Sequence, residues 1–168
     1  MSVRSQWLSF ALFVALVAPA AAVSTPVPGG ANAVSALSGK LGDTVFNGVL
    51  RIKVAALREA TDADNPSQEA PSADQKVMVM QTVLHNGKQD RFTDLVTYTL
   101  ADNDAVSFEI PSYKIKNINP SILQGAAVRQ SAVFVVDKDF KPVKLIIQCA
   151  SCNKAQGFRP VRFTLPAE

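Results

Sequence analysis

KVMVMQTVLH, residues 76–85, has the pattern that most clearly predicts the fold class of the chain. Alternate residues of a strand point to opposite faces, so the valines share one face while Met78, Met80 and Leu84 share the other. Apolar residues on both faces predict a strand that is central to the fold or whose second face is covered. We therefore interpret Met78 and Met80 as core residues rather than as soft metal ligands.

The segments before and after this stretch repeat the alternation that is typical of half-buried strands. Residues 49–57 place four apolar side chains on one face: Leu50, Ile52, Val54 and Ala56. Further strands are predicted at 44–46, 95–100, 106–110, 128–136, 143–147 and 161–165, separated by turn signals such as Asn47-Gly48 and Asp102-Asn103-Asp104. The connection at 114–125 should cross between two sheets. The pattern predicts an all-β, immunoglobulin-like two-sheet antiparallel β-sandwich of about 7–8 strands, with an up-and-down barrel as the alternative.

The amino terminus of this 168-residue chain has the pattern of a signal peptide. Arg4 supplies a positive charge, and small residues around Ala20 follow the apolar run. That run, 7–18, is about 12 residues long, which is below the roughly 20 that a membrane-spanning helix needs. We expect a signal peptide at 1–22, a flexible leader rich in Pro and Gly at 23–38, and one sandwich domain at 39–168.

Charge is balanced and spread along the chain, with 17 basic and 14 acidic residues. Nucleic-acid binding requires a concentrated basic face, and the sequence shows no block of like charge. Six basic residues are expected at outward-facing strand positions: Arg51, Lys53, Arg129, Lys144, Arg159 and Arg162. We interpret them as scattered solvated charges, and a shallow anion-attracting surface is the alternative.

Cys149 and Cys152 are the only cysteines of the chain. An exported protein meets an oxidising compartment, so a structural disulfide is the leading interpretation. Redox catalysis is the alternative, but it would need the first thiol at a helix amino terminus, and a strand precedes it here. Zinc would want two further ligands, and the chain holds a single histidine, His85.

A long polar segment, 59–74, is predicted to be an exposed loop and a candidate binding loop. It carries Asp62, Asp64, Asn65 and Glu69, whose oxygens are of the type that calcium prefers. Their spacing does not follow the helix–loop–helix calcium pattern. We therefore interpret them as solvated loop residues and predict no metal site and no cofactor.

Four stretches of the chain match one family in their order and spacing. They are 41–44, 76–80 running into Asn86-Gly87, 97–104, and 119–125 followed by 133–136 and 141–145. Together they resemble a bacterial extracytoplasmic immunoglobulin-like family of unknown function, which is also described as telokin-like and includes the mycobacterial immunoprotective extracellular antigens. The resemblance implies a sandwich fold and supplies no catalytic residues, and fold likeness does not transmit function.

No nucleophile elbow or comparable reaction motif accompanies His85, so we expect no enzyme. The sequence leads us to expect a secreted or periplasmic, non-catalytic binding module whose partner is a protein or a cell-envelope component. Two alternatives remain, a thiol–disulfide redox protein using Cys149 and Cys152 and a carrier of calcium or a small ligand. No transmembrane segment is expected after signal cleavage.

Overall fold

The computed structural model describes residues 36–152 and 157–166 of the chain. The expected signal peptide at 1–22 and nearly all of the expected leader at 23–38 lie outside the described residues. Ten strands are described, and their bounds are β1 Leu37–Lys40, β2 Thr44–Phe46, β3 Leu50–Glu59, β4 Gln75–Asn86, β5 Val96–Ala101, β6 Ser107–Glu109, β7 Ile115–Lys116, β8 Ala127–Asp137, β9 Lys144–Cys149 and β10 Val161–Thr164.

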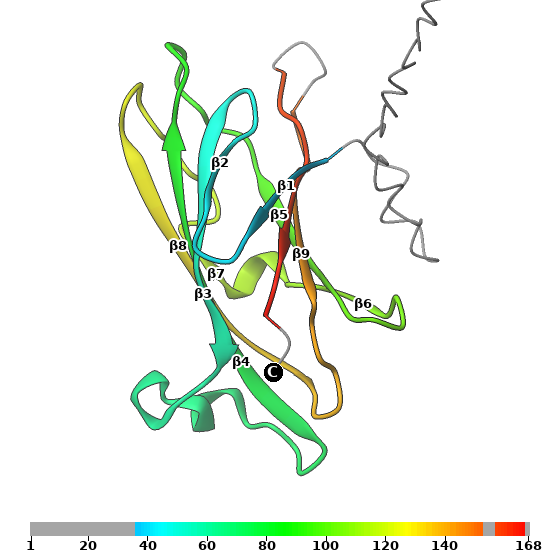
Figure 1. Cartoon of the computed structure of the whole chain (residues 1–168). Helices are drawn as coiled ribbons and strands as arrows, with labels where there is room; N and C mark the ends of the chain where they lie inside the picture. Colours follow the sequence, from blue (N-terminus) through cyan, green and yellow to red (C-terminus); the bar gives the residue numbers. More distant parts are fainter. Residues whose placement is uncertain (1–35, 153–156, 167–168) are drawn as a thin grey trace, which may run out of the picture.

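The strands form two five-stranded sheets that pack face to face (Figure 1). One sheet has the order β1-β10-β9-β5-β6 and the other has the order β2-β3-β4-β8-β7. The predicted two-sheet sandwich is confirmed. The chain crosses between the sheets at residues 110–114, between β6 and β7. The prediction that 114–125 makes this crossing was therefore wrong, because most of that segment is β7 and its connection to β8 within one sheet.

Two short strands raise the number of strands above the predicted 7–8. β1 has four residues and β7 has two, and neither is long enough to show an alternating pattern in the sequence. β1 begins at Leu37, two residues before the expected start of the domain. It pairs with β10 in the parallel direction, so the sandwich is not purely antiparallel.

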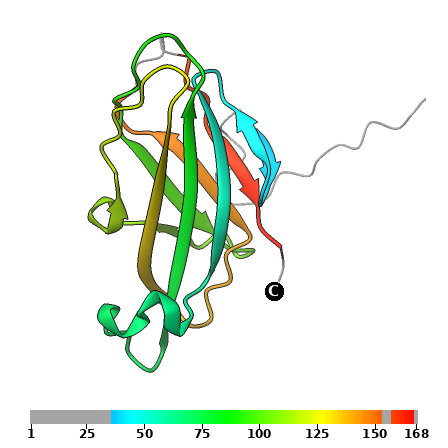
Figure 2. The same ribbon diagram turned by 90° about the vertical axis from the view of Figure 1, so that its left-hand side faces the viewer.

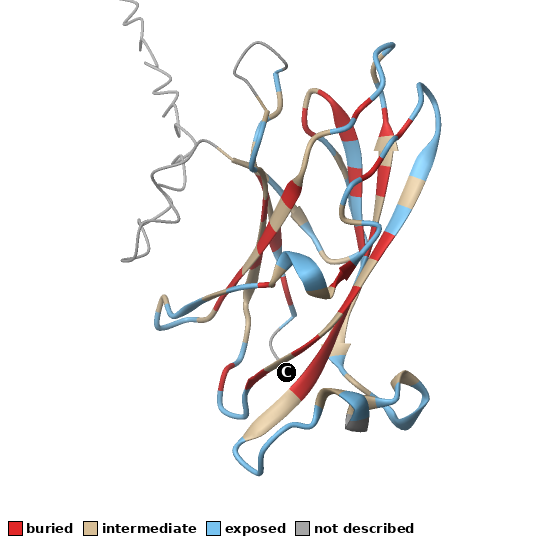
Figure 3. Ribbon diagram, turned by 180° about the vertical axis from the view of Figure 1, so that it is seen from behind, coloured by how far each residue is buried: buried red, intermediate tan, exposed pale blue. Residues whose placement is uncertain are grey.

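The core lies between the inner faces of the two sheets, where buried and exposed residues alternate along the strands (Figure 3). Met78 and Met80 belong to this core, as predicted. Its fully buried large side chains include Leu50, Ile52, Met80, Leu84, Tyr98, Leu100, Phe134, Leu145, Ile147 and Phe163. Burying such a side chain contributes about 1.5–3 kcal/mol each, so this layer holds the sheets together.

A β-bulge in β3 changes which residues face the core. The register with β4 shifts between Val54 and Ala56, so Ala56 lies opposite the outward-facing Gln81. Leu57 takes the inward position and packs against the core. The prediction that Ala56 faces inward was therefore wrong, because a bulge inserts one residue and reverses the alternation beyond it.

The outer face of β4 is covered, as its two apolar faces predicted. Val77 and Val79 point away from the core and are nevertheless buried. The segment after β3 lies over them as two short 3-10 turns, Asp62–Asp64 and Pro66–Glu69, and Ala60 donates its backbone N–H to the carbonyl of Val77. The expected loop at 59–74 is therefore a folded cover at one end of this sheet (Figure 2).

A polar network lies inside the core and joins the two sheets. Gln130 of β8 donates its side-chain N–H to the carbonyl of Asn117 at 2.8 Å, which turns its carbonyl oxygen toward the Tyr98 hydroxyl of β5. Tyr98 donates to that oxygen, and Thr82 of β4 shares a 3.2 Å hydrogen bond with the same hydroxyl. All three side chains are buried, so each hydrogen bond compensates groups that water cannot reach.

At the opposite end of the molecule, the buried side chain of Asn47 joins the turn before β3 to the segment before β10 by hydrogen bonds. Asn47 accepts the N–H groups of Val49 and Leu50 and donates to the carbonyl of Arg159, 112 residues away. Gly48 follows it with φ of +99°, and a Cβ there would lie 2.5 Å from the carbonyl oxygen of Gly157. Only glycine fits this hairpin turn without strain.

Candidate functional site: the outer face of the β2-β3-β4-β8-β7 sheet

Strand pairing brings polar and basic residues together on the outer face of this sheet. Lys53 lies opposite Val83, which lies opposite Arg129 in β8. In the next row, Gln81 lies opposite Ser131, which lies opposite Lys116 of β7. These residues come from four strands and share one side of the sheet, which is the side that Figure 2 shows.

Two adjoining hollows make a groove over these rows. The first, of about 520 Å³, is lined by Lys53, Ala55, Gln81, Thr82, Val83, Arg129, Gln130 and Ser131. The second, of about 630 Å³, is lined by Ala63, Asp64, Asn65, Gln68, Glu69, Val79, Gln81, Tyr113, Lys114, Ile115, Lys116, Ser131 and Val133. Gln81 and Ser131 line both hollows, so they form the middle of one continuous surface, which we call the sheet groove.

Each of the two carboxylates of the sheet groove forms an ion pair with a basic residue of the same chain. Asp64 pairs with Arg58 at 2.7 Å and also accepts the N–H and hydroxyl of Thr61. The hydrogen bond from Arg58 holds the pKa of Asp64 well below its usual range, with a further contribution from Thr61. Glu69 pairs with Lys114. These ion pairs fix the cover of the sheet groove in place.

The remaining cations of the groove have no such partner. Within residues 36–152 and 157–166, no carboxylate pairs with Lys53, Lys116 or Arg129, and all three side chains are exposed. The same is true of Arg51, which lies near the groove and stacks on Phe46, 5.3 Å from the ring centre. The positions of Arg51, Lys53 and Arg129 therefore support the alternative interpretation, in which outward basic residues form a shallow surface that attracts anions.

The floor of the groove carries unused hydrogen-bonding groups. The Gln81 amide and the Ser131 hydroxyl make no side-chain hydrogen bond to any other described residue. An amide offers both donors and an acceptor, and a hydroxyl offers both functions in one group. The phenol ring of Tyr113, 81% exposed, stands at the side of the second hollow.

Of the four residues predicted to form a binding loop, three line the sheet groove and one does not. Asp64, Asn65 and Glu69 line the sheet groove, and Asp62 is exposed and does not. They do not gather as a cation site, since the one cluster of three metal-ligand side chains among the described residues lies elsewhere. The groove residues Gln81, Lys116 and Tyr113 were not predicted from the sequence. The alternation of β4 could have indicated Gln81, but nothing local predicts that the two-residue strand β7 places Lys116 beside Ser131.

Cys149 and Cys152 form a disulfide at the end of β9, as predicted. The turn that it closes is held against the residues before β5. Ala150 donates its N–H to the carbonyl of Leu95 at 2.9 Å, and the hydroxyl of Ser151 donates to a carboxylate oxygen of Asp94 at 3.3 Å.

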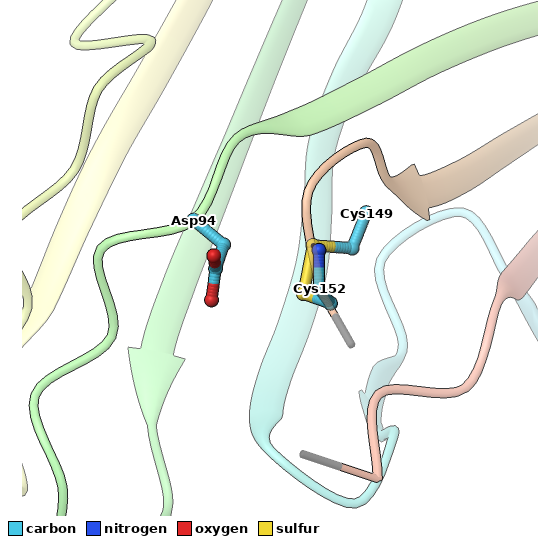
Figure 4. A group of neighbouring side chains, drawn as sticks. All are labelled: Asp94, Cys149 and Cys152. Atoms are coloured by element: carbon cyan, nitrogen blue, oxygen red, sulfur yellow. Dashed lines mark hydrogen bonds between the residues drawn. A yellow bond between two sulfur atoms is a disulfide. The ribbon is translucent and has the colours of Figure 1, made fainter. Parts of the chain in front are cut away.

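Asp94 completes a cluster of three ligand-type side chains with the two cysteines (Figure 4). Asp94 lies 55 residues before Cys149 in the chain, so the sequence around the two cysteines does not predict it. A strand leads into the first cysteine and a bend follows it up to Cys152, so the arrangement that lowers a thiol pKa at a helix amino terminus is not present in this part of the structure.

No family model and no curated protein matches the sequence. Solved structures similar to the chain include an uncharacterized β-sandwich protein from Clostridium difficile 630. It is 8% identical, covers 78% of this chain and 95% of its own, and has a TM-score of 0.48. A conserved hypothetical protein from Bacillus anthracis is 10% identical over 73% of this chain and 94% of its own, with a TM-score of 0.46. None of the described helical segments is long or apolar enough to span a bilayer.

Proposed function

We propose that this protein is a non-catalytic, secreted or periplasmic binding module, and that the sheet groove holds its partner. The observation that carries the proposal is the gathering of unpaired cations and unused hydrogen-bonding groups on one rigid face. Like charges on one surface repel each other, so this arrangement costs free energy that a bound partner of opposite charge would recover. Binding residues mounted on strands are held more precisely than residues on loops.

Features of the sequence support the location and the kind of protein. The charged, apolar and small-residue regions at 1–22 follow the order of a signal peptide. A disulfide between the only two cysteines suits an oxidising compartment. The four stretches that resemble the extracytoplasmic immunoglobulin-like family support the same placement.

Site-specific photo-cross-linking in the producing cell tests this function. A photoreactive residue at position 131 would lie in the middle of the sheet groove, and one at Thr164 would lie on the exposed outer face of the other sheet. We expect adducts from position 131 that Lys53→Gln together with Arg129→Gln suppresses, and few adducts from position 164. Equal adducts from both positions, or none from position 131, would refute the assignment of the groove.

A further inference from the structure

The chemistry of the sheet groove indicates the charge of its ligand. Lys53, Arg129 and Lys116 border the Gln81–Ser131 floor, and the carboxylates Asp64 and Glu69 are occupied by Arg58 and Lys114. Adjacent strands lie about 4.8 Å apart, so the backbones of Lys53 and Arg129, two strands apart, are separated by about 10 Å. A ligand that crosses the floor therefore meets positive charge on both sides.

The density of this charge argues against a nucleic acid. Duplex DNA presents one negative charge per about 1.7 Å of its axis, and proteins that bind it neutralise many phosphates at once. The groove offers three unpaired cations spread over three strands. That spacing suits a polymer whose negative charges lie further apart than those of duplex DNA.

The floor argues against a protein partner as the main occupant. Protein interfaces are centred on apolar and aromatic anchors that become fully desolvated. Here the middle of the groove is an amide and a hydroxyl, Gln81 and Ser131, and the exposed aromatic ring, Tyr113, stands at the side. Hydroxyl groups of a sugar would use both floor residues, and the apolar face of a sugar ring can pack on an exposed aromatic ring.

We infer that the sheet groove binds an acidic polysaccharide. Its acidic groups face Lys53, Arg129 and Lys116, and its hydroxyls bond to Gln81 and Ser131. This inference rests on the proposed function and names the class of partner that the groove takes. The two hollows share Gln81 and Ser131 and together extend over β3, β4, β8 and β7, so several sugars of one chain can lie across them.

Binding of the exported protein to polygalacturonate tests the inference. The matched probes are the same polymer after reduction of its carboxylates to alcohols, poly-glutamate and duplex DNA. We expect binding to polygalacturonate, little binding to its neutral form, and weakening as salt shortens the Debye length from about 10 Å at 0.1 M to about 3 Å at 1 M.

Two triple variants with the same net charge localise the binding. Lys53→Gln, Lys116→Gln and Arg129→Gln together should weaken polygalacturonate binding by at least about tenfold, because they remove the complementary charges. Lys40→Gln, Lys138→Gln and Lys141→Gln together should weaken it by less than about threefold, since these exposed lysines lie outside the groove. Urea unfolding of each variant shows that the fold is kept.

A third variant separates sugar recognition from charge. Tyr113→Ala should weaken the binding of polygalacturonate several-fold and leave any residual binding of poly-glutamate unchanged. Equal losses in the two triple variants, or preference for poly-glutamate or DNA over polygalacturonate, would overturn the inference. If the inference fails while position 131 still cross-links to a partner, the proposed function stands with a different ligand; if both fail, both are wrong.

Discussion

The hydroxyl of Tyr98 in one sheet donates a hydrogen bond to the side-chain oxygen of Gln130 in the other sheet, inside the core. Gln130 belongs to the same strand as Arg129 and Ser131 but points the opposite way. The residues that line the sheet groove are thus backed by a polar contact that fixes the position of β8 against the facing sheet. Burial raises the pKa of Tyr98, so the phenol stays protonated and remains a donor at all physiological pH values.

Removing this hydroxyl should destabilise the protein measurably. Tyr98→Phe leaves the oxygen of Gln130 and the hydroxyl of Thr82 without their partner, and a buried unsatisfied group costs about 1–3 kcal/mol. Urea unfolding should show this loss. The control is Tyr113→Phe, the same change at the only other tyrosine, which is exposed and should shift the free energy of unfolding by less than about 0.5 kcal/mol. Equal effects at the two positions would show that the network contributes nothing.

Gly48 and Gly42 form a matched pair for testing backbone strain. Both have positive φ, +99° and +93°, but a Cβ at Gly48 meets the carbonyl oxygen of Gly157 at 2.5 Å, whereas a Cβ at Gly42 meets no atom within 4 Å. Gly42→Ala should cost about 1 kcal/mol from the left-handed conformation alone. Gly48→Ala should cost clearly more in thermal unfolding, because the clash adds to the strain. A smaller loss for Gly48→Ala would contradict the packing of this turn.

The ion pair between Asp64 and Arg58 predicts a pH dependence. The folded-state pKa of Asp64 lies below its unfolded value of about 3.9, so the pair stabilises the folded protein above that pH and loses its contribution as the pH falls toward the folded pKa. Asp64→Asn should therefore lower the free energy of unfolding at pH 7, and the difference from wild type should narrow below about pH 4. Asp62→Asn, at an exposed neighbour, is the control. A difference that stays constant down to pH 2 would argue against the ion pair.

The disulfide should stabilise one turn without deciding the fold. It joins residues three apart, and the chain-entropy estimate for so short a loop is about 2 kcal/mol. The double variant Cys149→Ser, Cys152→Ser should therefore unfold at a lower temperature but still cooperatively, with an unchanged β-sheet circular dichroism spectrum. Thiol titration of the wild-type protein without reductant should find no free thiol. Loss of the fold in the double variant would show that the disulfide is essential.

The predictable part of the fold is the part in which single strands alternate over many residues. In β4 the alternation was long enough to place Met78 and Met80 in the core correctly. The same alternation gave the wrong faces in β3 beyond the bulge at Ala55, because one inserted residue exchanges the inward and outward positions and no local sequence pattern marks it. It also failed at β1 and β7, which exist only because a neighbouring strand supplies their hydrogen bonds.

The candidate site was predictable only in pieces. The outward positions of Lys53 and Arg129 followed from the strand pattern, but their placement around Gln81 and Ser131 depends on the register between β3, β4 and β8. The loop residues Asp64 and Glu69 were singled out for their carboxylates. Their ion pairs with Arg58 and Lys114 instead hold the folded 59–74 segment against the sheet, and Lys114 lies 45 residues from Glu69 in sequence.

Amide chemical shifts of the labelled protein, recorded during titration with an oligogalacturonate, show directly which face binds the ligand. We expect the largest shift changes at Gln81, Val83, Arg129 and Ser131 and none at Arg162 and Thr164 on the other sheet. Shifts confined to β9 and β10, or no shifts at a saturating concentration while the protein remains folded, would contradict the assignment of the sheet groove as the binding surface.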